Sequence, residues 1–176
     1  MKFSFLPVLL FFLIACEPSN EHAEGMKAPS VTMAVSTVHP IGESGVSGTV
    51  RFESVTGGVE VTAELSGLEE GNHGFHIHQY GDCTASDGIS AGGHFNPGGN
   101  EHSSPEAVNR HMGDMGNISA NSDGKASLSY TDGSITIDQI IGRGVIVHAG
   151  EDDLTSQPSG AAGSRIACGV IGVVQQ

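Results

Sequence analysis

Histidine is the residue whose number and spacing first suggest chemistry in this chain. The sequence holds nine His but only seven Lys plus Arg. His76 and His78 lie two positions apart and alternate with the apolar residues Phe75 and Ile77. On a β-strand both imidazoles would therefore point to one face, where they can bind one metal ion. Two surface histidines on the polar face of an amphipathic strand would give the same pattern.

A long stretch from 81 to about 113 is rich in Gly, Asn, Ser and Pro. Further residues of types that bind metals lie within it and directly after it. These are His94, His102, His111 and Asp114. Imidazoles with one carboxylate suit a four-coordinate Zn²⁺ ion. The histidines are spread along the stretch instead of forming a tract, which argues against adventitious metal binding. His148 ends a later apolar segment and could return to the face that carries His76 and His78.

Composition excludes several classes of protein. The net charge of -13 argues against a nucleic-acid partner, because such proteins need a basic surface. Glycine is abundant, at 26 residues, but proline is not, at 7, so the chain is neither collagen-like nor a disordered Pro/Gly tract. Many glycines with few charges favour short strands joined by tight turns.

The N-terminus resembles an export signal with an anchor. Lys2 precedes an apolar run at 3–14 that is short for a membrane span and typical of a signal peptide. The run ends at Leu-Ile-Ala-Cys16, which looks like a bacterial lipobox, although an ordinary secretory signal with an incidental Cys is the alternative. We predict a lipoprotein signal peptide at 1–15, a lipidated Cys16 with a flexible tether at 16–30, and a folded domain at 31–176.

The cysteine count agrees with export. Of three Cys, a lipidated Cys16 leaves an even pair, Cys83 and Cys168. A disulfide is the expected state of such a pair outside the cytosol, with two unrelated buried thiols as the alternative. It would close a loop of roughly 86 residues and stabilise the fold by at most ~4–5 kcal/mol.

The segments between these sites read as strands. Apolar and polar residues alternate over 46–53 and 59–66, and 117–130 reads as a hairpin around Asn-Ser-Asp-Gly at 121–124. Ile135 and Ile137 also alternate with polar residues. About eight strands are expected, without a convincing helix, which predicts an antiparallel sandwich or barrel.

Several longer motifs, in this order, resemble the copper–zinc superoxide dismutase family over about 31–173. They are Gly-Phe-His-Ile-His (74–78), Gly-Gly-His-Phe-Asn-Pro (92–97), Arg-His-Met-Gly-Asp-Met-Gly-Asn (110–117), Ile-Gly-Arg-Gly-Val-Ile-Val-His (141–148) and Gly-Ser-Arg-Ile-Ala-Cys-Gly-Val-Ile-Gly (163–172). The resemblance implies an all-β fold: an eight-stranded antiparallel Greek-key β-barrel with a long metal-binding loop and a short second active-site loop.

The resemblance also implies two ligand sets. Copper would be held by His76, His78, His94 and His148, and zinc by His94, His102, His111 and Asp114, with His94 shared between them. Asp152 matches a carboxylate that hydrogen-bonds one ligand of each metal; without the resemblance it would read as a solvated acid. Arg165 matches an arginine that presents its guanidinium to superoxide, the alternative being a surface Arg. His73 matches a framework histidine.

The implied activity is dismutation of superoxide to dioxygen and hydrogen peroxide by a redox-cycling copper, with His94 passing a proton and zinc in a structural role. A copper-binding or copper-carrier protein with the same fold and little turnover is the alternative. The segment between His148 and Arg165 is shorter than in many relatives and contains no Lys, so attraction of the anion should be weak. We expect a lipid-anchored protein of the cell envelope, on the periplasmic or outer-membrane side. A homodimer is expected because 169–172 matches a dimer contact of eukaryotic-type members.

Overall fold

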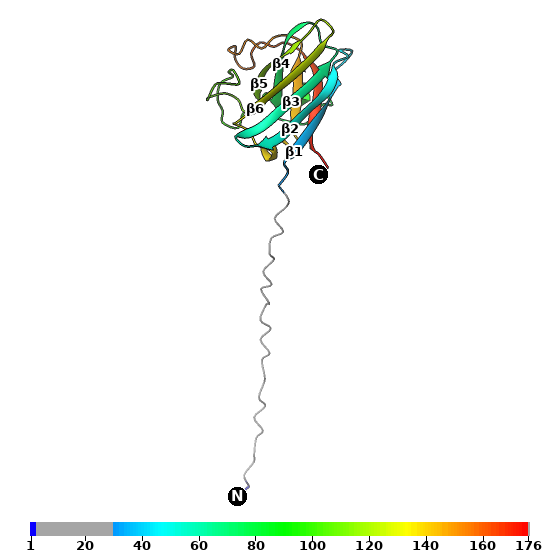
Figure 1. Ribbon diagram of the computed structural model, residues 1–176. Helices are drawn as coiled ribbons and strands as arrows, with labels where there is room; N and C mark the ends of the chain where they lie inside the picture. The colour runs from blue at the N-terminus through cyan, green and yellow to red at the C-terminus, as the bar shows by residue number, and fades with distance from the viewer. Residues whose placement is uncertain (3–29, 176) are drawn as a thin grey trace.

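The computed structural model describes residues 1–2 and 30–175 of the chain (Figure 1). The predicted signal peptide from residue 3 onward, Cys16 and the tether up to residue 29 lie outside the described residues. Within the described part, no helix has the length and apolar character needed to cross a membrane.

Eight strands make up nearly all of the regular structure in residues 30–175. They are β1 (Met33–Pro40), β2 (Ser47–Val55), β3 (Gly58–Ser66), β4 (Gly71–His78), β5 (Asp114–Ala120), β6 (Lys125–Asp132), β7 (Gly144–His148) and β8 (Arg165–Val173). Alternation of apolar and polar residues explains them: in β3, for example, Val59, Val61, Ala63 and Leu65 are buried while the residues between them are not.

The strands close into an antiparallel barrel in the order β1-β2-β3-β6-β5-β4-β7-β8. β3 pairs with β6 and not with β4, the next strand in the chain, so the connection from β3 to β4 crosses an end of the barrel in the Greek-key manner. The expected all-β fold with eight antiparallel strands is therefore confirmed. Closure leaves no free sheet edge to pair with another chain.

The barrel interior is the hydrophobic core, and β4 shows how it relates to the outer face. Phe75 and Ile77 are fully buried members of the core cluster, so His76 and His78, which alternate with them, point to the outside of the barrel. All four side chains are nonetheless buried. Loops must therefore cover this outer face, and the 95–113 and 149–164 segments lie over one side of the barrel (Figure 1).

Within the described part of the chain, two short helices depart from the expected all-strand pattern. α1 (Ile137–Ile140) follows β6, and the 3-10 helix η1 (Ile89–Ala91) lies in the loop after β4. The alternation of Ile135 and Ile137 suggested extended chain, but the Gln139 side chain accepts a hydrogen bond from the Thr136 N–H at 2.9 Å and caps one helical turn. This turn buries Ile137 and Ile140, three positions apart on one helix face.

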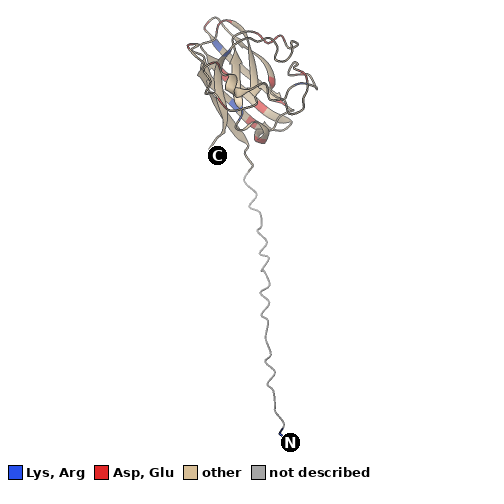
Figure 2. Cartoon of the chain, turned by 180° about the vertical axis from the view of Figure 1, so that it is seen from behind, with Lys and Arg blue, Asp and Glu red and all other residues tan. Residues whose placement is uncertain are grey.

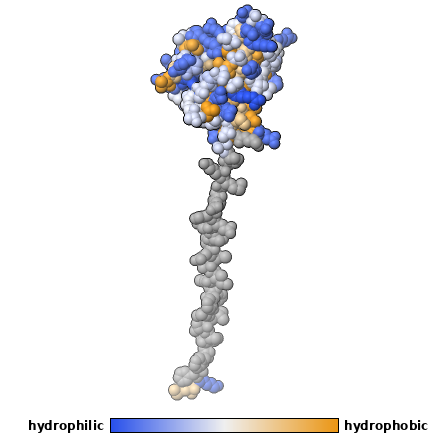
Figure 3. Space-filling view, in the orientation of Figure 1, coloured by the Kyte–Doolittle hydropathy of each residue, from blue (hydrophilic) through white to orange (hydrophobic). Residues whose placement is uncertain are grey.

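One face of the barrel shows how polar and apolar side chains are distributed over the surface. On the face drawn in space-filling form, hydrophobic residues gather only in small separate groups (Figure 3). Such scatter is ordinary for a water-exposed protein surface.

Candidate metal centre

Two adjacent strands provide the base of the site. β4 and β7 are antiparallel neighbours with Phe75 opposite Val147, so their outward residues share one face. Val147 belongs to the core, which turns the next residue, His148, outward beside His76 and His78. His94 joins them because its backbone forms an isolated β-bridge with His78.

These strands gather a first cluster of four buried imidazoles. It consists of His76, His78, His94 and His148, whose ligand atoms all lie within 4.8 Å of one another. Each ring has one buried nitrogen without a hydrogen-bond partner among the described residues: Nδ1 of His76 and Nε2 of the other three. Buried nitrogens left unpaired are costly, and four of them facing one point fit a bound metal ion.

The opposite nitrogens of three of these rings are held by the protein. His78 Nδ1 lies 2.9 Å from the Gly92 carbonyl oxygen, and His148 Nδ1 lies 3.1 Å from that of Gly163. A carbonyl oxygen can only accept, so these nitrogens carry the hydrogen and the Nε2 lone pairs face the cluster. His76 Nε2 likewise donates to Asp152 Oδ2 at 2.7 Å. The tautomers are therefore already those that a metal requires.

A second cluster adjoins the first and shares His94 with it. It consists of His94, His102, His111 and Asp114, again with ligand atoms within 4.8 Å of one another. Asp114 Oδ1 lies 2.8 Å from His94 Nδ1, 3.0 Å from His102 Nδ1 and 3.2 Å from His111 Nδ1. Three imidazole nitrogens converging on one carboxylate oxygen match the nitrogen and oxygen ligands of a tetrahedral zinc site.

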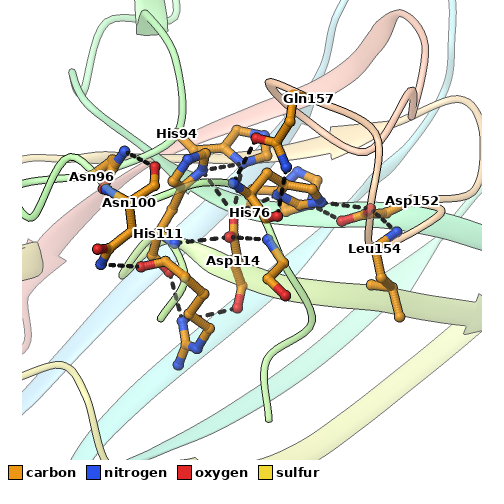
Figure 4. A network of polar contacts seen from close by, with 12 residues as sticks. His76, His94, Asn96, Asn100, His111, Asp114, Asp152, Leu154 and Gln157 are labelled. Atoms are coloured by element: carbon orange, nitrogen blue, oxygen red, sulfur yellow. Dashed lines mark hydrogen bonds and ion pairs between the residues drawn. The ribbon is translucent and has the colours of Figure 1, made fainter. Parts of the chain in front are cut away.

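Asp152 links the two clusters by bonding the ring nitrogens of His76 and His102 that point away from them. Its Oδ2 accepts from His76 Nε2, and its Oδ1 accepts from His102 Nε2 at 2.9 Å (Figure 4). Leu154 N–H donates to the same Oδ1 at 2.7 Å. The carboxylate is fully buried and orients one ring of each cluster.

Burial sets the charge state of the ligands. Desolvation lowers the pKa of His76 to about 3 and that of His148 to about 4, so both imidazoles are neutral at pH 7. Burial alone would raise the pKa of Asp114, but hydrogen bonds involving His94 and the Ser103 N–H outweigh it and hold the pKa at about 2. The two imidazoles and the Asp114 carboxylate are thus in the deprotonated form that binds metals.

An open cavity of about 410 Å³ gives access to the shared ligand. His78, His94, His148 and Arg165 are among the residues that line it. Arg165 donates from Nη1 to the Gly88 carbonyl and from Nη2 to the Gly92 carbonyl, each at 2.6 Å. It is the only Lys or Arg of the lining, and basic residues are sparse over the described chain (Figure 2). The cavity can therefore offer one fixed cation to a small anion.

A disulfide fixes the segment that supports Arg165. Cys83, in the loop after β4, is bonded to Cys168 on β8, with Cα atoms 5.8 Å apart. The predicted pairing is therefore present. It ties the loop that carries the Gly88 and Gly92 carbonyls to the strand that begins at Arg165.

Two other described histidines, His73 and His39, belong to neither cluster. His73 is buried, with its two ring nitrogens each 2.9 Å from a carbonyl oxygen, those of His148 and Glu69. These contacts link β4 to the end of β7 and to the segment before β4. His39 is exposed on β1, and His22 lies outside the described residues.

Sequence reasoning assigned no part to two side-chain amides that support the site. Asn117 Nδ2 donates to the Asp152 carbonyl and its Oδ1 accepts from the Asp152 N–H, both at 2.8 Å. Gln157 forms the same paired contact with the backbone of His102. Asn117 ends a quoted motif, but no pattern of residue types marks Gln157, because its partner lies 55 positions away.

A family model described as copper/zinc superoxide dismutase matches residues 46–171, well over half of the chain. The matched span contains every residue of both clusters, together with Asp152, Arg165 and the disulfide.

Proposed function

The chain belongs to the copper/zinc superoxide dismutase family, and on that premise we propose that it converts superoxide to dioxygen and hydrogen peroxide. One observation carries the proposal: two buried ligand clusters share a single imidazole, His94, whose Nδ1 faces one cluster and whose Nε2 faces the other. A lone structural metal would need only one cluster.

The donor sets support a different metal for each cluster. The cluster of His76, His78, His94 and His148 offers only imidazole nitrogens and opens to the cavity, as suits copper. The second cluster adds the carboxylate of Asp114, as suits a closed structural zinc site. Copper, when bound, supplies the one-electron chemistry that oxidises one superoxide to dioxygen and reduces a second, which takes up two protons, to hydrogen peroxide.

The chain's own groups would bind the anion and handle a proton. Arg165 is fixed by two carbonyl contacts, and the remaining N–H groups of its fork can bind superoxide in the cavity. His94 lines that cavity, and its buried Nε2 has no hydrogen-bond partner among the described residues, so this atom can hold a proton and pass it to the bound anion. Asp152 keeps His76 and His102 oriented throughout.

The cellular setting is proposed from sequence alone. The apolar segment at 3–14 and the lipobox-like Leu-Ile-Ala-Cys16 support export and a lipid anchor at the cell envelope. There the enzyme would remove superoxide formed outside the cytoplasm, which as an anion crosses membranes poorly. The homodimer expected from 169–172 stays a prediction.

The test is superoxide dismutation by the full chain after loading with copper and zinc, with both metals quantified in the same sample. We expect fast turnover at one copper and one zinc per chain, abolished when copper is chelated. Full copper loading without turnover would overturn the proposal and favour a copper-binding or copper-carrier protein.

A further inference from the structure

Gln157 forms a paired contact with the backbone of a residue on the facing loop. Its Oε1 accepts from the His102 N–H at 2.8 Å, and its Nε2 donates to the His102 carbonyl at 2.8 Å. One carboxamide thus satisfies both backbone polar groups of a single residue, as a neighbouring strand would. Figure 4 shows Gln157 reaching over the ligand clusters from the loop that also carries Asp152.

The backbone of His102 depends on this contact. In the described part of the chain, His102 makes no hydrogen bond to another backbone group. Its ring is held at Nε2 by Asp152, five residues before Gln157 in the same loop, while Nδ1 faces Asp114. Main chain and ring of His102 are therefore both oriented by the 149–164 segment.

The orientation of the carboxamide is fixed by a third bond. Gln157 Nε2 also donates to the Thr155 carbonyl at 3.2 Å, so both amide hydrogens are engaged. A flipped amide would place its oxygen against two carbonyl oxygens and its NH₂ against an N–H group. The contact therefore requires an amide, and a carboxylate of the same shape would not replace it.

The loop around Gln157 is itself braced. Asp153 Oδ1 accepts from the N–H groups of Thr155 at 2.9 Å and Ser156 at 2.7 Å. Gly160 has φ +69°, and a side chain there would collide with the Asp152 carboxylate and with His102 Nε2. Gln157 thus lies in a turn that is fixed by hydrogen bonds and packs directly against the Asp152–His102 contact.

We propose that Gln157 is a positioning residue for the zinc-side ligand His102, holding its main chain so that Nδ1 stays directed at the second cluster. This inference rests on the proposed function, since it takes that cluster as the zinc site. Gln157 opposes any movement of the His102 backbone that would turn Nδ1 away from the second cluster.

The experiment measures zinc affinity and zinc dissociation in the full chain by competition with a chromogenic chelator. Gln157→Ala removes all three bonds, and Gln157→Glu keeps the shape but lacks the NH₂ donor. Thr155→Ala is the matched control, because it alters a neighbouring exposed side chain and keeps the carbonyl that Gln157 contacts. Co²⁺ absorption reports the geometry of the same site, and thermal melting of the metal-free proteins reports the fold.

We expect Gln157→Ala to lower zinc affinity by roughly tenfold, with Gln157→Glu at least as weak and Thr155→Ala unchanged. The Co²⁺ bands should weaken in both Gln157 variants, while the metal-free melting temperature stays within about a degree or two, because Gln157 is exposed. Unchanged zinc affinity in Gln157→Ala would overturn the inference, as would a loss matched by equal destabilisation of the metal-free fold.

The same data separate this inference from the proposed function. If the unaltered chain gives no tetrahedral Co²⁺ spectrum, or if His102→Ala binds zinc as tightly as the unaltered chain, the zinc site itself is wrong. If those controls behave as expected and only the Gln157 variants do not, the inference alone fails.

Discussion

His94 Nδ1 lies 2.8 Å from Asp114 Oδ1, while Nε2 of the same ring is buried among the imidazoles of the other cluster. The ring thus spans two ligand groups whose remaining members come from separate parts of the chain: β4 and β7 on one side, the 95–113 loop and the start of β5 on the other. Any disturbance of His94 must therefore affect both groups.

Asp152→Asn should weaken zinc binding by about 10-fold to 100-fold, because an amide cannot accept from both His76 Nε2 and His102 Nε2. Equilibrium zinc titration with a competing chelator measures the effect. Glu151→Gln is the matched control: this neighbour is exposed, and a glutamine retains an acceptor for its bond from Asn72. Equal zinc affinity in Asp152→Asn and Glu151→Gln would show that the bridging carboxylate does not orient the ligands.

Arg165→Ala should lower kcat/KM for superoxide by roughly tenfold or more at unchanged metal content, because the cavity loses its only Lys or Arg. The kcat/KM of Arg165→Lys should lie between those of Arg165→Ala and the unaltered protein, since an ammonium cannot keep both carbonyl contacts and also face the anion. Stopped-flow decay of superoxide measures the rates, with Arg51→Ala on the exposed face of β2 as the control. A full rate in Arg165→Ala would remove Arg165 from the mechanism.

Ionic strength should have little effect on the reaction. The chain has a net charge of -13 and the cavity lining has no lysine, so long-range attraction of superoxide is weak. We expect less than about a twofold change in kcat/KM between 10 and 150 mM salt, although the Debye length falls from about 30 to 8 Å. Ser159→Lys places a cation in the lining and should raise the low-salt rate and make it fall with salt. A steep fall in the unaltered protein would contradict this prediction.

Tyr130→Phe should not destabilise the protein, because the Tyr130 hydroxyl is buried without a hydrogen-bond partner among the described residues. Burial raises the pKa of Tyr130 above its ordinary value of 10. The unfolded chain therefore loses this proton first as pH rises, so the folded state loses stability above about pH 10. The stability of Tyr130→Phe relative to the unaltered protein should grow by up to about 1.4 kcal/mol per pH unit above that point.

Urea unfolding at pH 8, 10 and 11 measures this difference. Tyr80→Phe is the control, because it removes the same hydroxyl from a tyrosine that is 60% exposed. A Tyr130→Phe variant that is less stable at pH 8, or whose advantage does not grow with pH, would indicate a partner for the hydroxyl.

The sequence predicted individual strands better than their pairing. Alternation in 59–66 matches β3, because a strand with one buried face leaves a local period of two. The pairing of β3 with β6 leaves no such local trace, and only the family resemblance led us to expect a Greek-key topology. The single turn of α1 was missed because its cap, Gln139 on Thr136, acts over a segment too short to show a helical period.

Candidate metal ligands were also easier to predict than the residues that hold those ligands in place by hydrogen bonds. His76 and His78 are marked by residue type and spacing, and the structure places them with His94 and His148. Gln157 is an exposed amide in a polar loop. Its hydrogen bonds to the His102 backbone form only because two loops that are distant in the sequence lie side by side. Such side-chain to backbone bonds are set by tertiary packing, which a single sequence does not display.

The most direct test of the account is the decay of superoxide, followed by pulse radiolysis, with the full chain holding one copper and one zinc. His148→Ala removes a ligand that belongs to the first cluster only, and exposed His39→Ala is its control. The account predicts rapid catalysed decay for the unaltered chain and His39→Ala, and for His148→Ala loss of copper and catalysis with zinc retained. Decay no faster than the spontaneous reaction in the fully loaded chain, or full activity in His148→Ala, would contradict it.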